Sequence, residues 1–226
     1  MNDYETEEQQ IEALKKWWKE NASSLILGVA VGVSGLFGWR YYIEQNHTHA
    51  IVASDMYMQV MQKAATKTID DQTIDLNNQL ITEFSDTPYA ALSSLALAKV
   101  EYENGNFESA VSQLELAVKH ASDDVVKQIS SLRLARVYID QKKYSEAAAI
   151  LNQPHESAYD AQVEELKGDL YSAKGELAQA RTAYDKAIDL LGASAGKWLK
   201  LKRKNLGQVT GSAHFDGFKP NSSIST

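Results

Sequence analysis

Residues 95–114 read LALAKVEYENGNFESAVSQL, and two later stretches, 132–151 (LRLARVYIDQKKYSEAAAIL) and 165–184 (ELKGDLYSAKGELAQARTAY), repeat the same pattern. In each copy a small residue is followed by an alanine twelve positions later. These pairs are Ala98 and Ala110, Ala135 and Ala147, and Gly168 and Ala180. Small residues at this spacing allow two antiparallel helices to approach closely, while a large side chain fills the space beside them. The pattern therefore predicts three consecutive helical hairpins.

The length of the repeat indicates its class. Ala110, Ala147 and Ala180 are separated by 37 and 33 residues, close to the ~34-residue period of tetratricopeptide-like (TPR-like) hairpins. Since one hairpin cannot bury its own apolar face, the hairpins must stack into an α-solenoid. The turns between paired helices are expected at residues 105–106, 142–143 and 175–176.

Further helices are expected on both sides of the repeats. Two lie within residues 44–85, and the second carries the apolar residues Ile74, Leu76, Leu80, Ile81 and Phe84. Thr87 is expected to cap the next helix, with Pro88 at its first position. A basic helix at residues 195–206 is expected to close the solenoid with a polar outer face, or to offer a patch for an acidic partner or anionic lipid.

A membrane span is predicted near the N-terminus. The nineteen residues from Asn21 to Trp39 are uncharged, and at ~1.5 Å per residue they cover about one hydrocarbon core. Aromatic residues that favour membrane–water interfaces flank this run on both sides. They are Trp17, Trp18, Trp39, Tyr41 and Tyr42. A buried core helix and a signal peptide are the alternatives, but no small-residue cleavage site follows the run.

Basic residues on the two sides of the span predict its orientation. Lys15, Lys16 and Lys19 precede it and Arg40 alone follows closely, so the N-terminus is expected in the cytoplasm and the remainder in the periplasm. Gly28 and Gly32 form a GxxxG motif, which could pack against another membrane helix. The predicted organisation is a cytoplasmic arm (1–20), an anchor (21–43), a periplasmic TPR-like domain (44–206) and a flexible tail (207–226).

Composition argues against several classes of function. The net charge of −7 makes a general nucleic-acid binder a poor fit. The chain has no cysteine and its five histidines are scattered, so we expect solvent-exposed histidines and no metal site or other cofactor. No nucleotide-binding or hydrolase motif occurs. We therefore expect a protein that is not an enzyme and takes no small-molecule substrate.

Short motifs in a specific order resemble the YfgM family, the ancillary subunits of the bacterial SecYEG translocon. The resemblance covers residues 1 to about 206. It is carried by Tyr4-Glu5, Glu12-Ala13, Glu20-Asn21, Gly28-Val29, Gly32-Val33, Gly38-Trp39-Arg40-Tyr41, Tyr89-Ala90-Ala91-Leu92, Ser94-Leu95, Leu132-Arg133-Leu134-Ala135-Arg136-Val137, Gly168-Asp169, Lys174-Gly175 and Asn205-Leu206.

This resemblance implies a single-pass inner-membrane protein with a periplasmic TPR-like domain near the translocon. It also implies association with the chaperone PpiD and a link to envelope stress signalling. Our leading hypothesis is a scaffold that helps to handle secreted or envelope polypeptides. The alternative is a regulatory tether in stress signalling that acts through the cytoplasmic arm, and an envelope hydrolase would instead require a deep polar pocket.

The concave face of the solenoid is the predicted partner-binding surface. In TPR-like folds the first helix of each hairpin lines this face. The register assigns it Leu95, Lys99, Tyr102, Leu132, Arg136 and Ile139, followed by Glu165 and Asp169 at an acidic end. Ordinary packing between helices is an equally good explanation for Leu95 and Leu132.

Overall fold

The computed structural model describes residues 7–206, where all regular secondary structure is helical. The predicted tail and the first six residues of the predicted arm lie outside this part. The chain divides into two compact units, Met1–Ser54 and Asp55–Thr226. The α-helices are α1 (Glu7–Ala65), α2 (Asp71–Glu83), α3 (Tyr89–Glu103), α4 (Phe107–Lys119), α5 (Asp124–Asp140), α6 (Tyr144–Leu151), α7 (Asp160–Ala173), α8 (Leu177–Leu191) and α9 (Lys197–Asn205).

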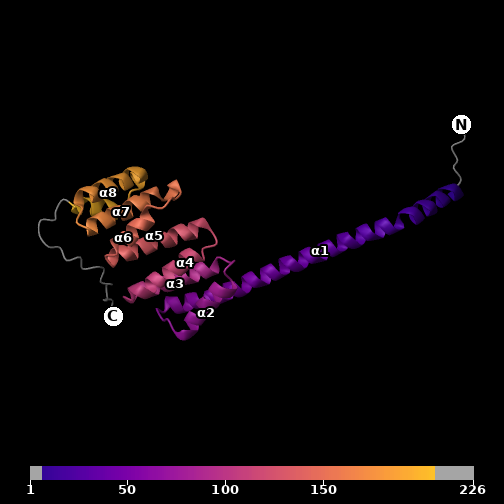
Figure 1. Cartoon of the computed structure of the whole chain (residues 1–226), viewed down its shortest axis with the longest axis horizontal. Coiled ribbons are helices and arrows are strands. Elements are labelled where there is room, and N and C mark those ends of the chain that lie inside the picture. Colours follow the sequence, from indigo (N-terminus) through magenta and orange to yellow (C-terminus); the bar gives the residue numbers. More distant parts are fainter. Residues whose placement is uncertain (1–6, 207–226) are drawn as a thin grey trace, which may run out of the picture. The chain divides into compact units, whose positions relative to one another are not determined.

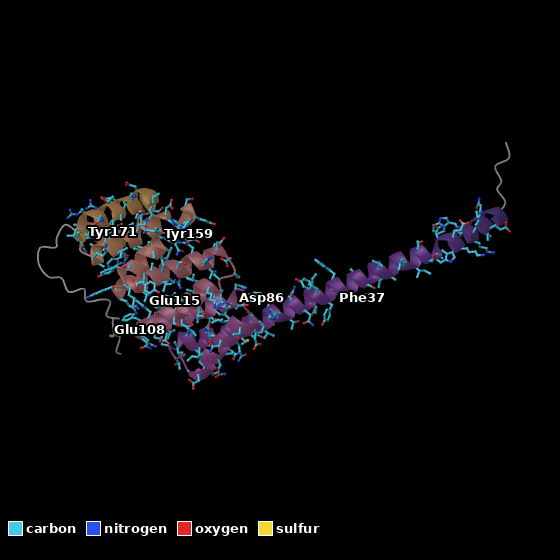
Figure 2. The ribbon with its side chains drawn as sticks, viewed as in Figure 1. Phe37, Asp86, Glu108, Glu115, Tyr159 and Tyr171 are labelled. Carbon is cyan, nitrogen blue, oxygen red and sulfur yellow. The ribbon has the colours of Figure 1, made fainter. Side chains whose placement is uncertain are left out.

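Helix α1 carries the predicted membrane span. It runs unbroken for 59 residues, so the first of the two helices expected within residues 44–85 is the continuation of this helix (Figure 1). Of the helices in residues 7–206, it is the one long and apolar enough to cross a membrane. None of its most apolar 18-residue window is buried, and large apolar side chains such as Phe37 project from it (Figure 2). This exposure argues against a core helix and favours a lipid environment.

Three hairpins form the predicted stack. Helix α3 packs against α4, α5 against α6, and α7 against α8, and the pairs follow one another in chain order (Figure 1). The first helices are also neighbours, because α5 contacts both α3 and α7. The predicted all-α fold, a helical-hairpin solenoid preceded by one long apolar helix, is therefore confirmed.

The small residues of the repeat lie where the paired helices approach each other. Ala110, Ala147 and Ala180 are completely buried. Gly168 lies against the ring of Tyr184 in α8, and a Cβ added at residue 168 would overlap two of the ring carbons. The third hairpin therefore requires glycine at this position.

The turns within the hairpins share one backbone geometry. Gly105, Lys142 and Gly175 all have positive φ, at +82°, +61° and +79°. This left-handed conformation ends a helix and lets an amide beyond it bond back to a carbonyl of the last turn. Each such bond measures 2.8 Å, and they join Asn106 to Glu101, Lys143 to Tyr138, and Glu176 to Tyr171.

Helix α2 buries a polar strip, which the expected apolar face did not include. Asn77 is 1% exposed, and its Oδ1 accepts hydrogen bonds from the hydroxyls of Ser93 and Ser94 at 2.6 and 3.3 Å. Its Nδ2 donates to Gln113 Oε1 at 3.2 Å. Ile74, expected on the apolar face, is 43% exposed. Buried polar groups are tolerated when each forms a hydrogen bond. Here the partners are distant in the sequence, so the local pattern of α2 did not predict that Asn77 is buried.

The boundary before α3 also differs from the expectation. Thr87 does not cap α3, because its hydroxyl donates instead to the carbonyl of Phe84 at 2.7 Å. Pro88 is the N-cap residue and the helix begins at Tyr89. A side-chain cap is present one helix earlier, where Asp70 Oδ1 accepts from the Thr73 amide at 2.9 Å.

Helix α9 closes the stack through α7 and α8. Leu199 and Leu206 join the buried cluster of α8. Lys202 donates to Glu165 Oε1 and Asp169 Oδ2 of α7, both at 2.8 Å. Arg203 forms a two-point contact with Asp185 of α8, at 2.7 and 3.0 Å. The predicted closing helix is therefore present, and ion pairs as well as apolar contacts hold it.

Candidate protein-binding surface

The six predicted partner-binding residues lie on α3 and α5 and divide into two groups by burial. Leu95, Leu132 and Ile139 are 7 or 8% exposed, within apolar clusters between helices. They pack the helices together, which is the alternative that the sequence left open for the leucines. The other three side chains, Lys99, Tyr102 and Arg136, reach the surface.

The exposed cations are available for new contacts. The side chain of Lys99 is 73% exposed, and its Nζ lies 3.8 Å from Glu103 Oε1, one turn along the same helix. Such exposed pairs are weak. Glu103 also lies 2.9 Å from Lys67. Lys99 can therefore exchange its partner at little cost.

Tyr102 is held in place by contacts on two sides. Its ring meets Phe107 edge-on, with centroids 5.4 Å apart. Its hydroxyl donates to Asp140 Oδ2 of α5 at 2.7 Å, joining the first helices of two neighbouring hairpins. Burial, with help from this hydrogen bond, raises the pKa of Tyr102 to about 12, so the phenol stays protonated and remains a donor at neutral pH.

Asp140 is the acidic member of this surface. Burial raises the pKa of its carboxyl group, although the hydrogen bond from Tyr102 and the nearby positive charge of Arg136 both lower it.

The α3–α5 face is the name used below for four residues, Lys99, Tyr102, Arg136 and Asp140. This face offers an oriented aromatic ring and two exposed cations, a combination suited to binding a peptide or a protein surface.

The predicted acidic end of the concave face is neutralised from within the chain. Glu165 and Asp169 both accept from Lys202, and Asp169 also accepts from the Tyr184 hydroxyl at 2.7 Å. Burial and Asp169 raise the pKa of Tyr184. Burial lowers the pKa of Lys202, but Asp169 and Glu165 raise it by more, so the ammonium stays charged. These two carboxylates therefore serve the closure of the fold.

Of the histidines in residues 7–206, His47 is exposed and His49, His120 and His155 are partly buried, so the expectation of solvent-exposed histidines holds only in part. The side chain of His155 is 19% exposed, with Nε2 3.1 Å from Asp160 Oδ1 and Nδ1 3.0 Å from the Gln153 carbonyl. It lines an open hollow with Asp160 and residues of α7 and α8, including Lys186. Within residues 7–206, no three potential metal-ligating side chains come together.

Two contacts between neighbouring repeats were not predicted from the sequence. Asp140 follows Tyr102 by 38 residues, and Lys202 follows Asp169 by 33. Both separations are close to one repeat length, and this is the signal that could have suggested contacts between neighbouring repeats. The identity of the partner atoms depends on side-chain directions, which the repeat length does not specify.

The fold and the α3–α5 face together define a helical-repeat protein of the TPR-like class with one helix able to span a membrane. Residues 15–208 match the family model of the tetratricopeptide repeat-like domain. The ancillary SecYEG translocon subunit of Haemophilus influenzae is 31% identical over 88% of this chain and 97% of its own length. The ancillary SecYEG translocon subunit of Escherichia coli K12 is 32% identical over 83% of this chain and 90% of its own length.

The chain belongs to the family of ancillary SecYEG translocon subunits, as its sequence motifs predicted. Among solved structures, a fragment of MamA from Desulfovibrio magneticus is similar, with a TM-score of 0.47 and 18% identity. That match covers 69% of this chain and 90% of the other.

Proposed function

We propose that the chain is a single-pass scaffold of the bacterial inner membrane that associates with the SecYEG translocon and has no catalytic role. The observation that carries this proposal is the family membership over nearly the full chain, with relatives named for that association. A TPR-like domain and a helix able to span the membrane support it. The anchor would confine the domain to the membrane surface and raise its effective concentration there.

The orientation in the membrane is part of the proposal. Three lysines lie just before the apolar run, and one arginine lies just after it. This asymmetry favours a cytoplasmic N-terminus. The repeat domain would then lie in the periplasm, on the side where secreted polypeptides emerge.

The α3–α5 face is the proposed contact surface for protein partners. Tyrosine and arginine are common among the residues that dominate binding energy at interfaces. Here Tyr102 is pre-oriented by Asp140, and the exposed Lys99 and Arg136 can donate to carboxylates or backbone carbonyls. Leu95, Leu132 and Ile139 would support this face from beneath. A PpiD-like chaperone and emerging polypeptides are the partners we propose for it.

A second contact is proposed within the membrane. Gly28 and Gly32 lie on α1, and apart from their chain neighbours and the adjacent helix backbone no described atom lies within 4 Å of the position that a Cβ would take. A helix of another membrane protein could approach α1 closely along this small-residue strip. This contact would attach the chain to its partner independently of the repeat domain.

Site-specific photocrosslinking in membranes tests the proposal. A photoreactive amino acid in place of Arg136 is expected to yield products with translocon subunits or a periplasmic chaperone. Replacement of Glu108, which is exposed on α4 (Figure 2), serves as the matched control and is expected to yield few. Equal products from both positions would contradict the α3–α5 face, and products from the GxxxG strip alone would assign recognition to the membrane helix.

A further inference from the structure

The outer face of α9 combines exposed apolar residues with exposed lysines. Trp198 is 76% exposed, Leu201 is 41% exposed, and Leu190 and Leu191, just before the short connection to α9, are 55% and 37% exposed. Large apolar side chains that follow one another in this way are not explained by the packing of the repeat domain. They mark a surface that associates with something else.

Helical geometry separates the outer face into two adjoining strips. Lys197, Lys200 and Lys204 follow one another at three- and four-residue spacing, so they lie on one strip. Trp198 and Leu201 are three residues apart and lie on the strip beside it. The opposite side of α9 faces the fold, where Leu199 is buried. The helix therefore presents a lysine strip next to an apolar strip to the solvent.

The three outer lysines are not used by the fold. Lys202 and Arg203 form the ion pairs that hold α9 against α7 and α8. Lys197, Lys200 and Lys204 are exposed and form no ion pair with any residue among 7–206. The sequence contains no Asp or Glu between Asp189 and Asp216. A chain with a net charge of −7 thus carries a local concentration of positive charge at this end of the solenoid.

We infer that the outer face of α9 docks on the anionic surface of the lipid bilayer in which α1 is anchored. Tryptophan favours the membrane–water interface, and lysines beside it attract anionic headgroups. A protein partner fits less well, because lysine is depleted at protein–protein interfaces. The inference rests on the proposed membrane anchorage, which would confine the repeat domain to the same membrane and so let a weak contact suffice.

The chain offers a direct probe of this contact. It has four tryptophans, so the triple substitution Trp17→Phe, Trp18→Phe and Trp39→Phe leaves Trp198 as the only one. This full-length variant is reconstituted into vesicles of phosphatidylcholine alone or of phosphatidylcholine with phosphatidylglycerol, each containing some brominated lipid. Co-flotation with the vesicles reports membrane anchorage separately from the fluorescence of Trp198.

The expected result is quenching of Trp198 by brominated lipid in the anionic vesicles and little quenching in the neutral ones. In the same background, the double substitution Lys197→Ala with Lys200→Ala is expected to weaken docking. The ratio of molecules with α9 docked on the bilayer to molecules with α9 undocked should fall roughly 30-fold, at about five-fold for each lysine. The matched control, Lys119→Ala with Lys127→Ala, removes two exposed lysines elsewhere and is expected to change nothing. Raising the salt concentration should mimic the loss of Lys197 and Lys200.

Three outcomes would overturn the inference. In the first, the protein floats with the vesicles but Trp198 stays open to an aqueous quencher in both lipids. In the second, quenching is equal in neutral and anionic vesicles. In the third, Trp198 becomes shielded only when a protein partner is added, which would make the outer face of α9 a protein-docking surface. Failure to float would instead contradict the anchor itself.

Discussion

The contact between Gly168 and Tyr184 explains why the third hairpin differs from the first two. In every hairpin the first small residue and a large residue of the second helix are sixteen positions apart. The three pairs are Ala98 and Leu114, Ala135 and Leu151, and Gly168 and Tyr184. The ring of Tyr184 occupies the space that a Cβ on residue 168 would need. The tyrosine, and not the helix, therefore requires the glycine.

Replacing Gly168 by alanine should lower the free energy of unfolding by about 1–3 kcal/mol, because the new methyl group overpacks the hairpin. Without the clash, alanine would stabilise the helix by ~1 kcal/mol relative to glycine. A measured loss of stability therefore identifies the clash as its cause. Denaturant unfolding in detergent micelles measures this. The double variant Gly168→Ala with Tyr184→Leu restores the pair of the other hairpins and should recover most of the loss. Purely additive effects of the two substitutions would contradict the explanation.

Asp70 links the end of α1 to the start of α2. The pKa of its carboxyl is lowered, first by the hydrogen bond from Lys63 at 2.7 Å and then by Thr73. A lowered folded-state pKa means that the unfolded chain binds more protons, so stability rises with pH. The contribution of Asp70 is therefore present above the unfolded pKa of about 4 and is lost as the pH falls below it.

The substitution Asp70→Asn should make stability less dependent on pH between about pH 2 and 5, where the carboxyl of the unfolded chain binds a proton and that of the folded chain does not. Unfolding midpoints across this range measure the effect. Asp71→Asn removes a negative charge from the neighbouring residue and is the control, with a smaller expected change. A pH dependence that survives Asp70→Asn unchanged would assign it to other carboxylates.

At the level of elements, the turn between α5 and α6 carries backbone strain that the other two hairpin turns avoid. Lys142 has the positive φ that Gly105 and Gly175 adopt freely. Lys142→Gly should therefore be neutral or stabilising by up to about 1 kcal/mol, whereas Gly175→Ala should destabilise by about the same amount. Thermal unfolding of both variants provides the measurement. Destabilisation by Lys142→Gly of more than about 1 kcal/mol would show that the lysine side chain matters more than its backbone.

The attachment of α9 should depend on one lysine. Lys202→Met keeps the apolar stem but leaves Glu165 and Asp169 without their shared cation. Because hydrogen bonds to charged groups contribute about 1.5–3 kcal/mol, amide hydrogen exchange in α9 should become roughly ten- to a hundred-fold faster. Lys200→Met, on the exposed side of the same helix, should leave exchange unchanged in neutral detergent micelles. Equal exchange in both variants would mean that Leu199, Leu206 and the Arg203–Asp185 contact hold the helix without Lys202.

The elements that could be predicted are those whose signals are local. The hairpins, their turns and the long apolar helix follow from spacing and composition, because each depends on residues within one repeat or one run. The buried face of α2 was predicted only in part. Leu80 and Phe84 are buried as expected, but Ile74 is exposed and Asn77 is buried instead, bonded to Ser93, Ser94 and Gln113. Such a network forms only when three helices meet, and no local pattern reports it.

The register predicted which helices carry the candidate residues, but not which of those residues are exposed. The register placed the surface on α3 and α5, and Lys99, Tyr102 and Arg136 are exposed there. A register uncertain by one residue cannot separate a side chain that faces solvent from one that faces the next helix. For this reason the predicted binding surface included Leu95 and Ile139, which are buried, and omitted Asp140, which contacts Tyr102.

For the whole molecule, the central claim is that the chain crosses the inner membrane once and leaves its repeat domain in the periplasm. The chain has no cysteine, so Glu12→Cys and Glu108→Cys each create a single reactive thiol. With a membrane-impermeant maleimide on intact spheroplasts, we predict labelling at residue 108 and none at residue 12 until the membrane is permeabilised. Labelling at residue 12 with residue 108 protected would contradict the claim.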